Sequence, residues 1–222
     1  MSPDDGVVAR ATTDRGEVVL VRRGPVLELR VNGVFVMDTA ETGSEIELAR
    51  AALRLVDHVE DVLVGGLGLG FTSREVLADT RVQRLVVVEI EEALIGWLRD
   101  GTVPHGPSYL ADGRLTVTNA DIKVAVAEAS AASFDLVLLD VDNGPDHLVY
   151  DENRAVYEDG FLAQVRRVLR PGGVLVVWSA AESDDLRAAM SRTFRNCEAI
   201  PHPVRLQTRD ERYWLYLSRA GE

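Results

Sequence analysis

Short apolar runs and longer amphipathic stretches alternate along the chain from residue 61 to residue 178. Five apolar runs bounded by turn residues predict strands, at 62–66, 84–89, 114–118, 134–140 and 174–178. Helical spacing of the apolar residues predicts helices between them, from about residue 73, over 91–99, from residue 121 and over about 153–169. This order predicts an α/β fold with a mostly parallel sheet that helices cover on both faces.

The remaining C-terminal pattern predicts one helix and two further strands. The helix is expected at 184–194, and the strands at 198–200 and 213–217. The two strands are expected to pair as an antiparallel terminal hairpin on the sheet edge, which gives a seven-stranded sheet. Apolar residues lie on both faces of the last strand, which favours burial on both sides and a homodimer.

The residues before residue 41 have a β-type pattern. Residues 17–40 are expected to form a small antiparallel β appendage with a tight hairpin at Asn32-Gly33. Residues 1–16 are polar and are expected to be a flexible N-terminus. The main α/β domain is then expected to span 41–222.

Composition and charge restrict the partners. The 222 residues carry a formal net charge of −12 and scattered basic residues, so we expect no nucleic acid and a small, neutral or cationic partner. The single cysteine, Cys197, excludes an intramolecular disulfide, and no cysteine–histidine cluster has metal-site spacing. The sequence has no secretion signal and no apolar run of about 20 residues, which predicts a cytoplasmic protein that binds no membrane.

A glycine-rich turn follows the strand at 62–66, and an acidic residue ends the next strand. The turn contains Gly66, Gly68 and Gly70, and the acidic residue is Glu89. Glycines let the backbone approach a cofactor closely, and a carboxylate in this place can accept both hydroxyls of a ribose. The sequence therefore predicts a nucleoside cofactor.

The residues between the glycines indicate which nucleoside. Phe71 stands where a dinucleotide fingerprint has its last glycine, which disfavours a pyrophosphate. Leu67, Leu69 and Phe71 make the turn apolar, which suits the carbon chain of a sulfonium nucleoside. We therefore expect S-adenosylmethionine or a relative. A nicotinamide-dependent oxidoreductase is disfavoured, because it would usually need a substrate domain that this length hardly provides.

Carboxylates also follow two later strands. Asp121 is expected to accept a hydrogen bond from the adenine amine, or to cap the following helix, and the two roles are compatible. Carboxylates crowd the segment 140–147, which begins at Asp140, so one of them is expected to have a raised pKa and to act as a general base for an amine. The alternative is a polar turn stabilised by Asn143-Gly144-Pro145.

Together these features resemble the spermidine synthase family of polyamine aminopropyltransferases, over residues 17–217. The resemblance rests on five segments: the turn and helix at 62–77, Val88–Glu91, Asn119–Asp121, the strand ending at Asp140, and Leu169–Gly173. The family implies a small N-terminal β domain before a class I S-adenosylmethionine-dependent methyltransferase fold, which is Rossmann-like, and it implies a dimer. By this resemblance Glu89 holds the ribose, Asp121 holds the adenine amine, and Asp140 deprotonates the attacking amine.

The chain differs from the family pattern in two places. Gly68 stands where the family has an aspartate that faces the amine of decarboxylated S-adenosylmethionine. Residues 44–48 replace a tyrosine, a histidine and a glutamate that help to bind the polyamine, and in this stretch Ser44 and Glu47 predict a helix-capping box. An open turn at Gly68 can accommodate the carboxylate of intact S-adenosylmethionine. This favours a methyltransferase.

The main prediction is therefore methyl transfer from S-adenosylmethionine to a small amine or hydroxyl acceptor. The first alternative is aminopropyl transfer from decarboxylated S-adenosylmethionine to a polyamine. The second is a non-catalytic nucleoside-binding or scaffold protein.

The predicted site residues follow from the motifs and the resemblance. The cofactor is expected to contact Gly66, Leu67, Gly68, Gly70, Glu89, Ile90, Asp121, Ile122 and Asp140. The acceptor is expected to contact Asp142, Asn143, Tyr150 and Trp178, where Asp142 or Asn143 corresponds to a second aspartate of the family's catalytic loop. Asp140 is the predicted catalytic base, and no metal is expected.

Overall fold

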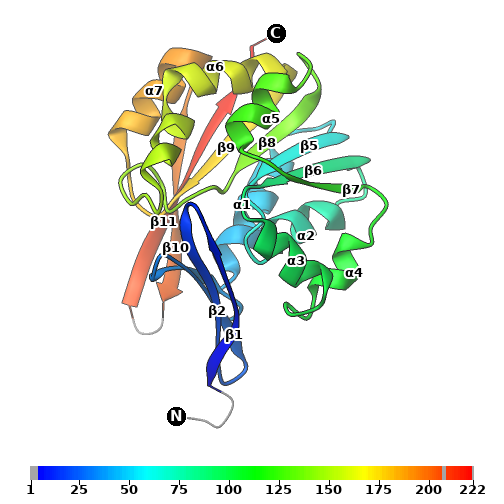
Figure 1. Ribbon diagram of the computed structural model, residues 1–222. Helices are drawn as coiled ribbons and strands as arrows, with labels where there is room; N and C mark the ends of the chain where they lie inside the picture. The colour runs from blue at the N-terminus through cyan, green and yellow to red at the C-terminus, as the bar shows by residue number, and fades with distance from the viewer. Residues whose placement is uncertain (1–4, 207–208, 222) are drawn as a thin grey trace.

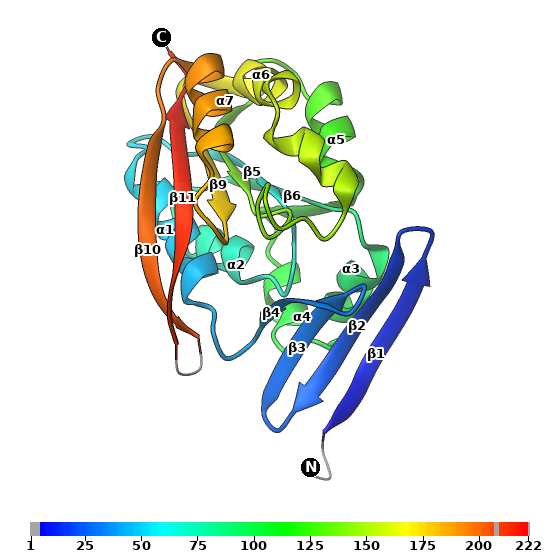
Figure 2. The ribbon, with the colours of Figure 1, turned by 90° about the vertical axis from the view of Figure 1, so that its left-hand side faces the viewer.

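The computed structural model describes residues 5–206 and 209–221 and contains two sheets (Figure 1). The N-terminal sheet has four strands in the order β1-β2-β3-β4, and the main sheet has seven in the order β10-β11-β9-β8-β5-β6-β7. Helices cover both faces of the main sheet, and the N-terminal sheet lies beside its carboxyl-terminal edge (Figure 2). The predicted α/β fold, with its seven-stranded sheet and terminal hairpin, is confirmed.

The N-terminal sheet is larger than expected. It consists of four antiparallel strands: β1 (Gly6–Thr13), β2 (Gly16–Arg23), β3 (Val26–Val31) and β4 (Val34–Asp38). The prediction of a flexible N-terminus over 1–16 is wrong from residue 6 onwards, because β1 pairs with β2 as an edge strand. Its side chains are mostly exposed, so it lacks the apolar alternation by which a strand is recognised in a sequence. Residues 1–4 lie outside the described residues.

The main sheet brings together the predicted strand ends. Five parallel strands form its centre and one edge: β5 (Asp61–Gly65), β6 (Arg84–Glu89), β7 (Leu115–Asn119), β8 (Phe134–Leu139) and β9 (Leu169–Ser179). The antiparallel strands β11 (Arg209–Arg219) and β10 (Glu198–Leu206) complete the other edge. The chain runs outwards from β5 to β7 and returns at β8, beside β5. The strand order therefore reverses between β5 and β8, where open α/β sheets bind their ligands.

Two apolar cores lie on opposite faces of this sheet. One face is covered by α1 (Gly43–Arg54), α2 (Phe71–Ala78), α3 (Glu92–Arg99) and α4 (Gly106–Leu110). The other is covered by α5 (Ile122–Glu128), α6 (Asp159–Val168) and α7 (Asp184–Phe194). Leu136 and Leu138 of β8 belong to the first core, whereas Val137 and Leu139 belong to the second. This alternation explains why the strand is a continuous apolar run.

Several elements differ from the prediction. The strands expected at 198–200 and 213–217 are longer, since β10 runs to Leu206 and β11 begins at Arg209, and the short helix α4 was not predicted. The single helix expected at about 153–169 is a 3₁₀ segment, η1 (Asp151–Tyr157), followed by α6. The turn expected at 170–173 lies inside β9 as a bulge, because Leu169 pairs with Phe134 and the register resumes only at Val174. Among the described helices, none has the length and apolar character required to cross a membrane.

Candidate functional site

Two adjoining cavities lie at the carboxyl ends of the parallel strands. The first, here called the turn cavity, is lined by the glycine turn, by residues 88–91 and 120–122, and by side chains of β3 and β4. The second, here called the acidic cavity, has a volume of about 350 Å³ and is lined partly by β4 and α1. The cavities share Val36, Gly68, Asp140, Val141 and Asp142. A ligand that fills the turn cavity can therefore reach a second molecule in the acidic cavity.

The glycine turn is held in a conformation that L side chains rarely adopt. Gly66 has φ +94° and donates its amide hydrogen to the Val88 carbonyl, at 2.9 Å between the heavy atoms. A Cβ atom on Gly66 would lie 1.9 Å from the carbonyl oxygen of Asp140. Glycine at this position therefore allows the turn to pack against the end of β8.

A side chain of β4 occupies the space that a Cβ atom on Gly68 would need. Its φ is +50°, and a Cβ atom there would lie 2.6 Å from Sδ of Met37, which also accepts a hydrogen bond from the Leu69 amide at 3.2 Å. The thioether of β4 thus occupies the Cβ direction of Gly68, while Gly68 still lines both cavities, so room for a methionine carboxylate at this turn remains a prediction. This contact could not be predicted from the sequence, since Met37 precedes the turn by about 30 residues and belongs to the other sheet.

Glu89 is buried at the end of β6 and accepts two backbone hydrogen bonds. Its Oε2 accepts from the Leu67 amide at 2.9 Å, and its Oε1 accepts from the Glu91 amide at 2.7 Å. Burial raises the pKa of the Glu89 carboxyl, while these hydrogen bonds oppose the shift. Each carboxylate oxygen has a further lone pair for a ligand hydroxyl. The ribose role of Glu89 remains a prediction that this arrangement fits.

Asp121 caps α5. Its Oδ1 accepts a hydrogen bond from the Lys123 amide at 2.8 Å, and its Oδ2 lies 3.3 Å from the Lys123 ammonium. The capping alternative is therefore confirmed, while contact with adenine remains a prediction. Asp121 and the predicted Ile90 and Ile122 all line the turn cavity. The predicted Leu67 and Gly70 do not line it.

Asp140 directly follows β8 and lines both cavities. Burial removes water from the Asp140 carboxyl and raises its pKa to about 6. A hydrogen bond of 3.0 Å from the Thr72 hydroxyl to Oδ2 partly opposes this shift. The carboxylate is therefore more basic than an exposed aspartate and lies where the two cavities meet. Its position and basicity suit the predicted general base.

Glu45 is a candidate site residue that was not predicted. It lines the acidic cavity from α1, and its pKa is raised to about 7, first by burial and then by the nearby charge of Asp140. The predicted capping box is wrong: Thr42 is the N-cap without a side-chain hydrogen bond, and the Ser44 hydroxyl donates to Glu45 at 2.7 Å. The overlooked signal is that Glu45 shares a helix face with the buried Leu48.

We expect Glu45→Gln to stabilise the fold at pH 8. Ionised Glu45 is disfavoured in the folded state, so its contribution becomes unfavourable as pH rises from its ordinary pKa of 4.5 towards 7. Gln removes this charge, and urea unfolding at pH 8 should show a gain of about 1–3 kcal/mol that shrinks at pH 5. Glu47→Gln, outside the cavity on the same helix, is the control. The same pH dependence of stability in Glu45→Gln as in the wild type would contradict the raised pKa.

Among the four predicted acceptor residues, Asp142 is engaged in hydrogen bonds within its own loop, whereas each of the other three lines one of the cavities. Asp142 holds its own loop together, because it accepts hydrogen bonds from the Asn143 and Val149 amides at 2.7 Å and from the Asn153 side chain at 2.8 Å. Trp178 lines the acidic cavity and packs against Tyr213, with ring centroids 4.9 Å apart. Asn143 also lines the acidic cavity, whereas Tyr150 lines the turn cavity.

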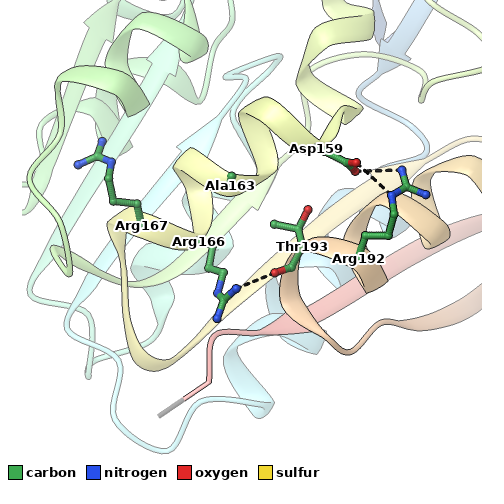
Figure 3. Close-up of a pocket in the computed structure, with 6 residues that line it drawn as sticks. All are labelled: Asp159, Ala163, Arg166, Arg167, Arg192 and Thr193. Carbon is green, nitrogen blue, oxygen red and sulfur yellow. Dashed lines mark hydrogen bonds and ion pairs between the residues drawn. The ribbon is translucent and has the colours of Figure 1, made fainter.

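Another hollow lies between α6 and α7 (Figure 3). It has a volume of about 510 Å³ and shares no lining residue with the other two cavities. Its arginines bind protein groups: Arg192 pairs with Asp159 at 3.0 Å, and Arg166 donates to the Thr193 carbonyl at 2.9 Å. These contacts join the two helices, so the hollow is not the candidate site.

Known proteins resemble this chain in sequence and in fold. Polyamine aminopropyltransferase 2 of Pseudomonas aeruginosa is 32% identical over 165 residues, which cover 71% of this chain and 45% of that protein. Putrescine N-methyltransferase 3 of Nicotiana tabacum is 29% identical over 148 residues, which cover 65% of this chain and 36% of that protein. The chain thus spans less than half the length of these two curated relatives.

Structural similarity extends over nearly the whole chain. The crystal structure of spermidine synthase from Thermotoga maritima has a TM-score of 0.82 at 15% sequence identity, with coverage of 97% of this chain and 73% of the other. The family described as Spermine/spermidine synthase domain matches residues 44–202, which include the glycine turn and all the carboxylates discussed above. The chain therefore belongs to the spermine/spermidine synthase family.

Proposed function

We propose that this protein transfers an aminopropyl group from decarboxylated S-adenosylmethionine to a small amine. The observation that carries this proposal is the position of Asp140, a carboxylate with a pKa of about 6 at the junction of the two cavities. A nucleoside donor in the turn cavity and an amine in the acidic cavity would meet at this group. Membership of the family supports the same reaction.

The turn cavity offers suitable partners for the nucleoside. Glu89 keeps free lone pairs for the ribose hydroxyls, and Asp121 lies on the next strand end, where it can accept from the adenine amine. The open space in this cavity is only about 90 Å³, whereas ligand pockets usually hold several hundred.

Charge favours the decarboxylated donor. Five carboxylate residues line the acidic cavity: Asp38, Glu41, Glu45, Asp140 and Asp142. None of the described residues that line either cavity is a lysine or an arginine. The carboxylate of intact S-adenosylmethionine would have no cationic side chain there and would face like charges, whereas an amine would be attracted. For this reason the aminopropyl reaction replaces methyl transfer as the preferred function.

Asp140 would act on the acceptor amine. The bound donor would supply a carbon made electrophilic by positive sulfur. Attack forms the new nitrogen–carbon bond as the sulfur–carbon bond breaks, with its electron pair kept on sulfur and methylthioadenosine released. Asp140 accepts the proton that the nitrogen loses, and its raised pKa makes it a stronger base. Glu45, across the cavity, would attract a second positive charge of the acceptor.

Methyl transfer to an amine is a second candidate. Gly68 removes the aspartate that the family resemblance associates with the decarboxylated donor, and the chain is 29% identical to a putrescine N-methyltransferase. This alternative uses the same base and the same acidic cavity. It differs in the donor, which keeps its carboxylate, and in the carbon that reacts, so that S-adenosylhomocysteine is released.

The test is a product assay with each donor and putrescine as the acceptor. We expect methylthioadenosine and an aminopropylated amine with decarboxylated S-adenosylmethionine, and at least about tenfold weaker binding of the intact donor by calorimetry. Release of S-adenosylhomocysteine with intact donor would establish methyl transfer instead. Nucleoside binding without any product would support the non-catalytic alternative, and no binding of either donor would overturn the proposal.

A further inference from the structure

Met37 lies between the glycine turn and the acidic cavity. It is the only buried residue of β4, and it lines the acidic cavity. Its Sδ accepts a hydrogen bond of 3.2 Å from the Leu69 amide and occupies the Cβ direction of Gly68. Because Gly68 lines both cavities, the thioether lies beside the place where they join.

A β-bulge in β4 turns Met37 towards this place. The pairing of β3 with β4 shifts by one residue between Leu29 and Arg30, so Val36 is an extra residue without a partner on β3. Met37 thereby pairs with Leu29, a buried residue that lines the turn cavity, and points to the same face of the sheet. Without the bulge it would lie opposite Glu28 and point to the other face.

The glycine turn has no backbone amide left for a carboxylate. Among the amides of residues 66–70, two donate to backbone carbonyls, two donate to the Glu89 carboxylate, and that of Leu69 donates to Met37. Residues 71–73, at the start of α2, line neither cavity. Met37 therefore covers the only amide of the turn that would otherwise be free.

We propose that Met37 selects the decarboxylated donor, because its thioether occupies the space that the carboxylate of intact S-adenosylmethionine would need beside Gly68. This inference rests on the proposed function. The two donors differ by one carboxylate on the carbon that carries the amine. A thioether offers a carboxylate neither charge nor a hydrogen-bond donor, whereas it can pack against the methylene groups of an aminopropyl chain. Such selection does not need the aspartate that Gly68 replaces.

The test is calorimetry of wild type, Met37→Ala and Met37→Leu with both donors and with methylthioadenosine. Methylthioadenosine lacks the amine chain, so it reports on the nucleoside site alone, and its affinity should change less than about threefold in both variants. We expect wild type to prefer the decarboxylated donor about tenfold or more, and Met37→Ala to prefer it less than about threefold, through tighter binding of the intact donor. Met37→Leu keeps the side-chain volume and should keep the preference.

Leu27→Ala is the matched control. Leu27 is 3% exposed on the same face of β3 as Leu29 and lines neither cavity, so its truncation should lower stability without changing the donor preference. Met37→Val, which is shorter but suits a strand, replaces Met37→Ala if the alanine variant does not fold.

Two results would overturn the role of Met37 alone. One is an unchanged donor preference in the folded truncated variant, and the other is an equal loss of preference in Leu27→Ala or Met37→Leu. A wild type that binds no nucleoside, or that prefers the intact donor, would instead contradict the proposed function itself.

Discussion

Gly66→Ala is expected to destabilise the fold by about 2–5 kcal/mol and to abolish activity. The added Cβ would lie 1.9 Å from the Asp140 carbonyl oxygen, and the residue would be strained at φ +94°. A small movement cannot easily remove this clash, because the carbonyl oxygen belongs to the backbone. The strands that precede Gly66 and Asp140, β5 and β8, are also fixed by their pairing with each other. The measurement is urea unfolding by circular dichroism, together with the product assay.

Gly96→Ala is the control for this substitution. Gly96 lies inside α3, and an added Cβ would meet no atom within 4 Å. Its replacement should leave activity intact and stabilise the helix by up to about 1 kcal/mol. Wild-type stability and activity in Gly66→Ala would show that the turn can shift away from β8, contrary to the geometry described here.

The main sheet could be predicted from the sequence because its signals are local. Parallel strands buried on both faces are continuous apolar runs, as in the strand that ends at Asp140, and the intervening helices repeat with their own period. The carboxyl ends of parallel strands meet at one edge, so Glu89, Asp121 and Asp140 could be expected close together. The structure brings all three to the turn cavity.

The parts that were missed depend on contacts between distant residues. Nothing near Gly68 in the sequence reveals that Met37 fills its turn, or that Arg15 reaches Glu91 from the other sheet. The edge strand β1 was missed because its pairing satisfies backbone groups and buries few apolar side chains. Helical spacing places Glu45 on the same face as the buried Leu48, but it could not show that Asp140 lies across a cavity from that face.

The repulsion between Glu45 and Asp140 at the acidic cavity favours a cationic ligand. Glu45 and Asp140 have raised pKa values because burial weakens their hydration, and the Asp140 charge adds to the shift of Glu45. A cationic amine between them would relieve both effects. The instability expected from Glu45 at pH 8 and the proposed affinity for amines therefore have the same physical origin.

Asp140→Asn is expected to lower turnover by about 100-fold or more, while the affinity for methylthioadenosine changes less than about threefold. The amide oxygen of asparagine can still accept from the Thr72 hydroxyl, so the local structure is kept, but the amide cannot accept the proton of the amine. Calorimetry and the product assay measure the two quantities separately. Asp146→Asn, exposed in the same loop and outside both cavities, is the control.

The same substitution should change the pH profile in a defined direction. A base works only when it is deprotonated, so wild-type kcat/KM should rise with pH through about 6, the pKa of Asp140, and this rise should disappear in Asp140→Asn. The pKa of Glu45 should fall in the variant, because the charge that helps to raise it has been removed. A profile that keeps its rise near pH 6, or a loss of nucleoside affinity as large as the loss of turnover, would assign Asp140 to binding and not to proton transfer.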